Sequence, residues 1–312
     1  MSIVLVTGGG GFIGREVAKQ LLSRKYKVRL FDLVGTDIEE ADGCHTTGSI
    51  LDPYELSKAV RGCDYVIHLA AAVGVQRTEK NQLECLFINI QGTVNVLDAC
   101  VRERAKKIVF ASSSEVYGEP KSCPITEEAP LNPISNYAVS KIVGEQYLNA
   151  YAETYGIKYN IVRLFNVYGE YQKREFVIPN FVKNVLDDKP PRVYGKGKQV
   201  RSFCYVEDAA RGIVSALFCP RAGGEIFNIG NDYEPISIKD LAQKVIKISR
   251  RPLKPSFVNY NNSDRVSERD ILTRIPSIEK AKRILKFRPQ VSLDDGLSRM
   301  ISFYKSKGNE AV

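Results

Sequence analysis

The stretch Ile3-Val-Leu-Val-Thr-Gly8-Gly-Gly-Gly11-Phe-Ile-Gly14 decides the fold of this chain. Its first five residues form an apolar run, which is typical of a strand buried in a parallel sheet. A glycine stands at every third position from Gly8 to Gly14, and a helical pattern begins there. Because glycine lacks a Cβ atom, the backbone can turn tightly and approach a pyrophosphate, which the free N–H groups of a helix start can bind. The order of strand, glycine turn and helix predicts a dinucleotide-binding unit.

The carboxylate of Asp32 indicates which dinucleotide this unit binds. It ends the next apolar run, Val28–Phe31, eighteen residues after Gly14. A carboxylate at this point can accept hydrogen bonds from the adenosine ribose hydroxyls and repels a 2′-phosphate. Asp32 therefore predicts NAD rather than NADP, and the alternative interpretation is a solvated loop aspartate.

Strand and helix patterns alternate through the first half of the chain. Further strands are predicted at Tyr65–Leu69, Lys107–Ser112 and Ile161–Phe165, with helical patterns between them. This alternation predicts an α/β fold with a doubly wound parallel sheet, the Rossmann fold, over residues 1–165. Later elements are shorter, and we expect residues 166–312 to form mainly a smaller α/β lobe that binds the substrate. Residues 195–218 are expected to return to the main sheet.

Composition excludes several classes of function. The 312 residues include no apolar run long enough to cross a membrane and no basic N-terminal region typical of a signal peptide. The net charge of +9 comes from basic residues interspersed with acids, without a recognisable nucleic-acid module. Seven scattered cysteines and two histidines give no zinc-binding pattern and indicate reduced thiols. We therefore expect a cytoplasmic protein without a metal site.

The stretch Tyr137-Ala-Val-Ser-Lys141 carries the candidate chemistry. On a helix, a tyrosine and a lysine four residues apart lie on the same face. A phenol with a reference pKa of about 10 is a poor base, but a nearby lysine cation lowers that pKa. Such a pair could take a proton from a sugar hydroxyl near neutral pH. The spacing also occurs where a tyrosine packs beside a solvated lysine, so it is weak evidence by itself. The hydroxyl-rich stretch Ser112–Gly118 strengthens it, because it follows a predicted strand at the sheet edge where ligands bind.

Together these motifs resemble the extended short-chain dehydrogenase/reductase family, and are most similar to its NAD-dependent nucleotide-sugar epimerases, dehydratases and decarboxylases. The matching stretches follow the family's order over nearly the whole chain: Thr7–Gly14, His68–Ala71, Asn89–Thr93, Ser112–Gly118, Tyr137–Lys141, Arg163–Asn166, Arg201–Asp208 and Pro276–Leu285.

The resemblance implies a role for each matching residue. Tyr137 would be the base or acid at the sugar 4-hydroxyl, Lys141 would lower its pKa and bind the nicotinamide ribose, and Ser113 would hydrogen-bond the same hydroxyl. The NAD pocket would also include Gly8, Gly11, Phe12, Ile13, Gly14, Asp32, Ser49, Ile50, Leu69, Ala70, Ala71, Asn89 and Ser112. The nucleotide-diphosphate sugar, most simply a UDP-sugar, would contact Ser114, Asn166, Asn180, Tyr194, Arg201, and either Arg265 or Arg274. The family also implies a homodimer through two helices of each subunit, here residues 85–104 and 136–155.

Two positions depart from the family's patterns. Ser49 stands where relatives often have an aspartate that contacts the adenine. Ser114 and Glu115 stand where dehydratases usually carry Asp-Glu, so a 4,6-dehydratase is disfavoured, because eliminating water needs both an acid and a base. Glu115 resembles the glutamate of UDP-glucuronate decarboxylases and is included among the candidate catalytic residues. We therefore expect a UDP-hexose or UDP-hexuronate 4-epimerase, with a lyase as the alternative and a non-catalytic NAD-binding protein as a third hypothesis.

Overall fold

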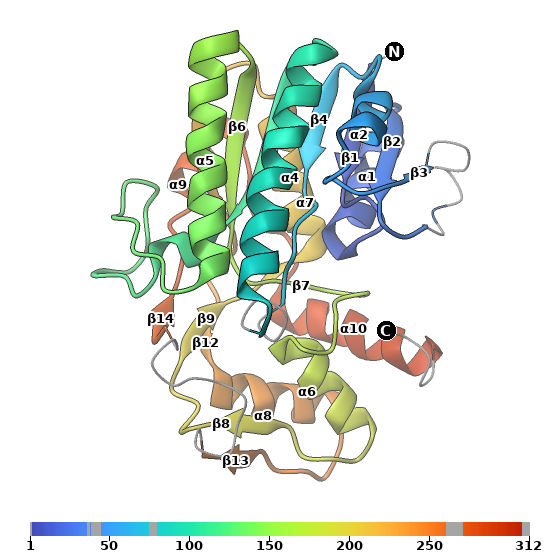
Figure 1. Cartoon of the computed structure of the whole chain (residues 1–312). Coiled ribbons are helices and arrows are strands. Elements are labelled where there is room, and N and C mark those ends of the chain that lie inside the picture. The colour runs from blue at the N-terminus through green and yellow to red at the C-terminus, as the bar shows by residue number, and fades with distance from the viewer. Residues whose placement is uncertain (1, 36–37, 39–44, 75–79, 260–270, 308–312) are drawn as a thin grey trace.

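The computed structural model describes residues 2–35, 38, 45–74, 80–259 and 271–307 (Figure 1). A parallel sheet with its helices forms the upper part of the molecule in Figure 1, and α6, α8 and several short strands form a lobe below it. Among the described residues, no helix has both the length and the apolar character needed to cross a membrane.

Seven of the described strands form the main sheet, in the order β11-β6-β5-β4-β1-β2-β3, and every pairing in it is parallel. The strand order reverses direction between β1 and β4, as in a doubly wound sheet, so the predicted Rossmann fold is confirmed. The strands are β1 (Ile3–Thr7), β2 (Lys27–Asp32), β3 (His45–Thr47), β4 (Tyr65–His68), β5 (Lys107–Ser113), β6 (Lys158–Leu164) and β11 (Glu225–Ile229).

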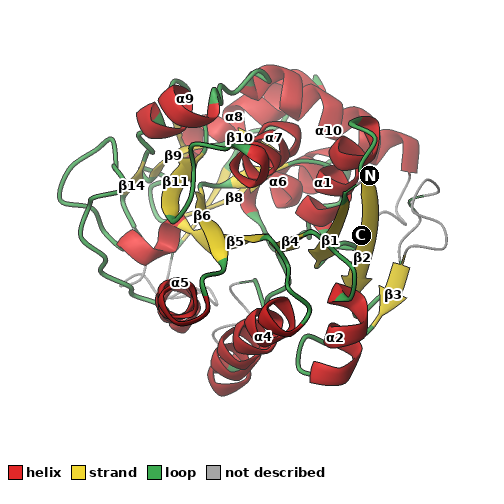
Figure 2. Ribbon diagram, turned by 90° about the horizontal axis from the view of Figure 1, so that it is seen from above, coloured by secondary structure: helices red, strands yellow, loops and turns green. Residues whose placement is uncertain are grey.

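Helices cover both faces of this sheet (Figure 2). One face carries α1 (Phe12–Ser23), α7 (Val206–Phe218) and α9 (Glu279–Leu285), and the other carries α2 (Pro53–Val60), α4 (Gln82–Arg102) and α5 (Asn136–Tyr155). Each layer buries its own apolar core against the central strands, which explains why those strands are apolar on both sides.

Local signals fix the ends of α5, the helix that carries the Tyr137–Lys141 stretch. The Ser135 hydroxyl accepts a hydrogen bond from the backbone N–H of Ala138 at 3.1 Å, which caps the first turn. Gly156 ends the helix in the left-handed conformation, which a residue without a Cβ atom adopts readily. At Gly144 the helix approaches the sheet so closely that a Cβ atom there would lie 2.6 Å from the Phe110 ring. The helix is thereby held tightly against β5.

The lobe is built from short elements around a third apolar core. These are β7 (Val167–Tyr168), α6 (Val177–Leu186), β8 (Arg192–Tyr194), β9 (Val200–Ser202), β10 (Cys204–Tyr205), β12 (Pro235–Ser237), α8 (Ile238–Ser249), β13 (Ser256–Val258), β14 (Thr273–Arg274) and α10 (Leu293–Lys307).

The path of the chain between the two parts differs from the one the sequence indicates. Of the segment 195–218, α7 packs on the main sheet, but β9 and β10 pair with short strands outside it. β11 lies in the range expected for the lobe, yet it pairs with β6 as the edge strand of the main sheet. The reason is that the apolar face of α7 packs beside α1, which brings the chain back to the edge of the sheet.

Candidate active site

The glycine turn between β1 and α1 forms a cradle without side chains. Gly8 has φ +73°, and a Cβ atom there would lie 2.8 Å from the backbone nitrogen of Ala70. A Cβ atom on Gly14 would collide with the carbonyl oxygen of Gly8. Helix α1 begins after Gly11 with no side-chain cap and no acidic residue in its first turn. Its N-terminus is therefore open to an anion, which fits the pyrophosphate of a dinucleotide.

Asp32 lies beside this cradle at the end of β2. Its Oδ2 accepts a hydrogen bond from the backbone N–H of Gly10 at 3.0 Å, and its Oδ1 accepts one from Leu33 at 2.7 Å. Because each carboxylate oxygen has a second lone pair, both can also accept a ribose hydroxyl. The structure thus joins the glycine turn and the carboxylate, as an NAD site requires.

The other predicted cofactor residues lie on the neighbouring segments. Leu69, Ala70 and Ala71 leave β4, and the backbone N–H of Leu69 donates to the Thr7 carbonyl at 3.1 Å. The Asn89 side chain accepts from the backbone of Ala72 at 2.7 Å and donates to the Ser140 hydroxyl at 3.0 Å. Asn89 therefore ties α4 to α5 and to the segment that follows β4.

Four further residues predicted to bind the cofactor have packing or turn contacts within the protein. Phe12 and Ile13, half-buried in the first turn of α1, pack against the core of the lobe. Ser49 accepts a hydrogen bond from the backbone of Leu51 at 3.1 Å, as a turn residue does. Ile50 is buried, and a Cβ atom on Gly92 of α4 would collide with it.

Lys141 is buried, and Tyr137 is half-buried one turn earlier on α5. The Lys141 ammonium donates to the carbonyl oxygen of Ala111 on β5 at 2.8 Å and lies 5.6 Å from the centre of the Tyr137 ring. Burial lowers the pKa of Lys141 to about 8. The predicted mechanism requires a cation beside the Tyr137 phenol, and the fold places the Lys141 ammonium there.

Ser113 forms a hydrogen bond with the Tyr137 phenol. Its predicted contact with the sugar 4-hydroxyl stays a prediction. The Ser113 oxygen already accepts from the backbone N–H of Glu115 at 3.2 Å, so its own proton is available for the phenol oxygen. The pKa of Tyr137 is nevertheless raised, first by burial and then by the negative charge of Glu115. The expectation of a lowered pKa thus does not hold for the protein alone, because these two effects outweigh the hydrogen bond from Ser113.

Glu115 is held from two sides at the start of the short helix η2 (Ser114–Tyr117). Its Oε2 accepts a hydrogen bond from the Ser135 hydroxyl at 3.1 Å, and its Oε1 lies 3.9 Å from Nη1 of Arg274. The same Nη1 donates to the Ser114 hydroxyl at 3.3 Å. Nε of Arg274 is buried without a hydrogen-bond partner within the described chain. A cation from the lobe therefore meets the carboxylate that comes from the end of β5.

Comparison with known proteins identifies the family of this chain. The model of the NAD dependent epimerase/dehydratase family matches residues 4–230. The chain belongs to this family. It is therefore an NAD-dependent enzyme of the group, and the predicted family and cofactor are confirmed.

Relatives of this family with more than one activity resemble the chain. It is 34% identical to a putative UDP-glucose 4-epimerase of Methanocaldococcus jannaschii, over 97% of this chain and 99% of the relative. It is also 34% identical to a UDP-N-acetyl-alpha-D-glucosaminuronate decarboxylase of Bacillus cytotoxicus, over 98% of each chain. The solved UDP-glucose 4-epimerase of Thermotoga maritima superposes with a TM-score of 0.89 at 29% identity, over 98% of this chain and 99% of that one.

In this family member, part of the predicted substrate site is assembled at the start of the lobe. Arg201 of β9 and Arg274 of β14 are register partners in parallel strands. Asn166, with φ +40°, donates its side-chain amide to the Ser202 carbonyl at 3.0 Å, beside Arg201 in the chain. The structure thus brings together three of the predicted substrate residues, and Arg274 also lies near the Glu115 carboxylate.

Of the remaining substrate predictions, Ser114 contacts this group through Arg274, and two others lie elsewhere in the lobe. Asn180 is exposed on α6, where it accepts a hydrogen bond from Asn184 at 3.0 Å, and Tyr194 ends β8. Arg265 lies outside the described residues. Ser114 is buried under Arg274.

Ser112 and His68 have structural partners instead of open positions. The Ser112 hydroxyl, predicted to meet the cofactor, donates to Glu145 at 2.5 Å. His68 bridges Thr7 at 2.7 Å and Thr93 at 3.2 Å. Burial, followed by the charge of Lys141, lowers the pKa of His68 to about 3, so its ring stays neutral. Sequence reasoning missed Glu145, although it continues the Tyr137 and Lys141 spacing by one more turn.

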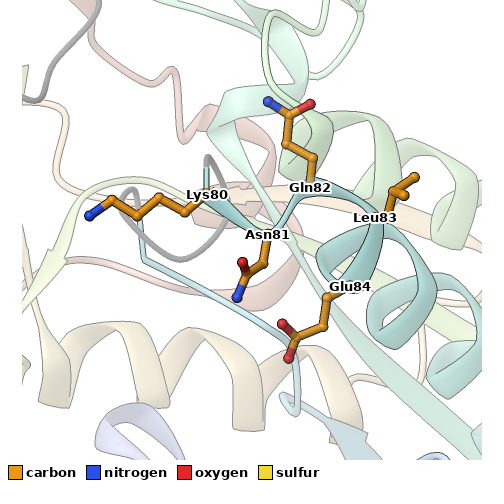
Figure 3. A pocket seen from close by; sticks show the side chains of 5 residues that line it. All are labelled: Lys80, Asn81, Gln82, Leu83 and Glu84. Atoms are coloured by element: carbon orange, nitrogen blue, oxygen red, sulfur yellow. The ribbon is translucent and has the colours of Figure 1, made fainter.

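A hollow of about 500 Å³ lies at the beginning of α4, lined by five consecutive residues, Lys80 to Glu84. Their side chains diverge, with Gln82 and Glu84 on opposite sides of the backbone (Figure 3). Gln82 accepts a hydrogen bond from Asn136 at 2.9 Å, so the hollow is next to the first residue of α5. We place the cofactor at the glycine turn and not in this hollow, because the lining comes from this one segment.

Proposed function

We propose that this enzyme is a nucleotide-sugar 4-epimerase that acts on a UDP-hexose or a UDP-hexuronate through a transient 4-keto sugar. The observation that carries the proposal is the Tyr137 phenol, held by the Ser113 hydroxyl above the buried Lys141 ammonium. This arrangement suits proton transfer at a hydroxyl group next to a nicotinamide.

The side chains divide the work at the sugar 4-hydroxyl. Bound NAD would supply the acceptor for the hydride of C4 and the donor that returns it. Tyr137 takes the proton of the hydroxyl and later returns it, and Ser113 holds the oxygen in place. Lys141 supplies positive charge beside the phenol, which stabilises the phenolate. Because C4 is planar in the keto sugar, a sugar that turns in the site can receive the hydride on its other face, and the proton on Tyr137 then returns to O4.

The diphosphate belongs in this proposal at the arginines of the lobe. Arg201 and Arg274 lie on adjacent strands, and an arginine presents paired N–H donors that suit phosphate oxygens. The Asn166 amide lies beside them. Binding here would leave the sugar directed toward the end of β5, where Ser113 and Tyr137 meet.

A decarboxylating lyase is the second candidate, and Glu115 is the observation that favours it. Oxidation at C4 of a UDP-hexuronate gives a β-keto acid, which loses CO2 readily. The Glu115 carboxylate, whose Oε1 lies 3.9 Å from Nη1 of Arg274, would then assist the loss of CO2. A UDP-sugar-acid decarboxylase among the relatives supports the same alternative. A 4,6-dehydratase has less support, because buried Ser114 stands in place of an acid.

Product analysis separates these candidates. The purified protein is incubated with UDP-glucose, UDP-glucuronate and UDP-N-acetylglucosamine in turn, and the products are identified by NMR. We expect the C4 epimer of at least one substrate, with its sugar otherwise intact. Release of CO2 from UDP-glucuronate would establish the lyase instead. Bound NAD without turnover of any nucleotide sugar would establish a binding protein.

We also propose that the enzyme works as a cytoplasmic homodimer that pairs through α4 and α5. The two helices pack side by side (Figure 1), and their outer faces carry large apolar side chains. Leu83 is 84% exposed and Phe87 is 59% exposed on α4, and Val139 and Tyr147 are exposed on α5. A second copy would cover this face, because apolar surface of this extent favours association. The described cysteines are free thiols, which supports a reducing compartment.

A further inference from the structure

Helix α5 is attached to β5 by hydrogen bonds from successive turns. Lys141 donates to the Ala111 carbonyl at 2.8 Å, and Tyr137 hydrogen-bonds Ser113, two residues further along the strand. Residues spaced by four lie on one helical face, so this face of α5 is aligned along the end of β5.

Glu145 lies one turn further along this face of α5 and accepts a hydrogen bond from Ser112, the residue between Ala111 and Ser113 on β5. It is 2% exposed, and its Oε1 accepts the Ser112 hydroxyl at 2.5 Å. Arg163 of β6 donates to the same carboxylate through Nε at 3.0 Å and Nη2 at 2.6 Å. Two parallel N–H bonds fix both the position and the plane of the carboxylate. Glu145 therefore sets where α5 lies along both β5 and β6.

The arginine of this pair is itself anchored in the interior. Its Nη1 donates to the Tyr117 hydroxyl at 2.8 Å, and Tyr117 donates in turn to Asn228 of β11 at 2.8 Å. The same Nη1 donates to the Glu127 carbonyl at 3.1 Å. The Glu145 carboxylate is thus connected through fixed donors to three strands of the sheet, which leaves it little freedom to shift.

The titratable groups that face Lys141 come from three elements of the described chain. Tyr137 and Glu145 lie on its own helix, Cys85 lies on α4, and His68 ends β4. His68 is neutral, so Glu145 is the carboxylate within the described residues that faces the Lys141 ammonium. Burial lowers the pKa of Lys141 to about 8, and the charges of Cys85 and then of Glu145 act in the opposite direction.

We propose that Glu145 is a positioning residue of the active site, which fixes α5 on the sheet and keeps Lys141 cationic through its negative charge. The inference rests on the proposed function, in which Lys141 must carry a positive charge beside Tyr137. Arg163 has the opposing role, because it holds the carboxylate while partly cancelling its charge at Lys141.

Three variants test the inference through the titration of Lys141 itself. The protein is labelled with ε-¹³C-lysine, and the Lys141 signal is assigned by its loss in Lys141→Met. In Glu145→Gln we expect the Lys141 pKa to fall by about one unit, since a negative charge is removed near a cation. In Arg163→Met we expect a rise of about one unit, and in the double variant a value near that of the wild type.

Circular dichroism and thermal unfolding show which variants fold. If Glu145→Gln does not fold, Arg163→Met and the charge-free double variant carry the test. An unchanged Lys141 titration in every folded variant overturns the inference, because a carboxylate that only holds the helix would weaken folding without moving this pKa. Shifts in the two expected directions support it.

Enzyme assays of the same variants distinguish this inference from the proposed function. The alkaline limb of the kcat profile, where Lys141 loses its proton, should move down by about one pH unit in Glu145→Gln. If the wild type turns over a nucleotide sugar but the Lys141 pKa is the same in the wild type and in every folded variant, the inference is refuted and the proposed function stands. Shifts of that titration in a protein that turns over no nucleotide sugar refute the proposed function and leave the coupling of Glu145 to Lys141 standing.

Discussion

Replacing Lys141 with methionine should stabilise the protein at pH 7 while it abolishes turnover. Burial lowers the pKa of Lys141 from its ordinary value of 10.5 to about 8. At about 1.4 kcal/mol for each pH unit, keeping this side chain charged in the folded protein costs about 3 kcal/mol. Methionine removes that cost but leaves the Ala111 carbonyl without its donor, a loss of about 1 kcal/mol. We therefore expect the free energy of unfolding at pH 7 to rise by about 2 kcal/mol.

The dependence on pH gives this prediction a definite sign. Between pH 8 and 10.5 the unfolded protein binds more protons at Lys141 than the folded protein does, so wild-type stability rises with pH in this window. Below pH 8 both states carry the proton and this contribution is constant. The advantage of Lys141→Met should therefore shrink as the pH rises from 8 and reverse near pH 10.

Urea unfolding of the cofactor-free protein between pH 6.5 and 10 measures this difference. The matched control is Lys107 at the other end of β5, which is also buried with its pKa lowered to about 8 and which donates to the carbonyls of Ala216 and Ala222. Lys107→Met should show the same trend with pH and keep its kcat. The reasoning is refuted if Lys141→Met is less stable than the wild type at pH 7 by an amount that does not change with pH.

Three further outcomes follow from the site. Tyr137→Phe should lower kcat by at least about 10³-fold and keep NAD bound, because the phenol oxygen is the proton acceptor; activity within tenfold of the wild type would remove Tyr137 from that role. Glu115→Gln should leave an epimerase within about threefold of wild-type kcat, whereas a comparable loss to that of Tyr137→Phe would indicate the lyase. The double variant Leu83→Lys, Phe87→Lys should be a monomer by light scattering where the wild type is a dimer, and an unchanged mass would refute pairing through α4.

The sheet and the cofactor side of the site could be predicted because their signals are local. The glycine spacing, the apolar run before it and Asp32 fall within thirty residues of one another. Each acts through backbone geometry that its own segment determines, and the structure places Asp32 against the turn at 3.0 Å as a result. The family resemblance added the order of the later motifs, which is consistent with the fold that forms.

The substrate side could not be predicted in the same way, because it depends on pairing between distant segments. Arg274 reaches Glu115 only after β14 has paired with β9, and two residues in a strand give no recognisable pattern. The return of β11 to the main sheet was missed for a related reason. A five-residue strand does not indicate which sheet it joins, and the packing of α7 decides that.

The order of charged groups along α5 and onto β6 explains how Lys141 can carry a positive charge in a buried position. From the end of β5 inward, the side chains are a phenol at Tyr137, a cation at Lys141, a carboxylate at Glu145 and a second cation at Arg163. Each charge lies between groups of opposite or neutral character, so no like charges are neighbours. The Arg163 end is fixed in the sheet interior by hydrogen bonds, whereas the Tyr137 end is open to the substrate. Because hydrogen bonds hold the buried groups in place, we expect the positive charge of a bound nicotinamide to lower the pKa of the Tyr137 phenol without being offset by movement of those groups.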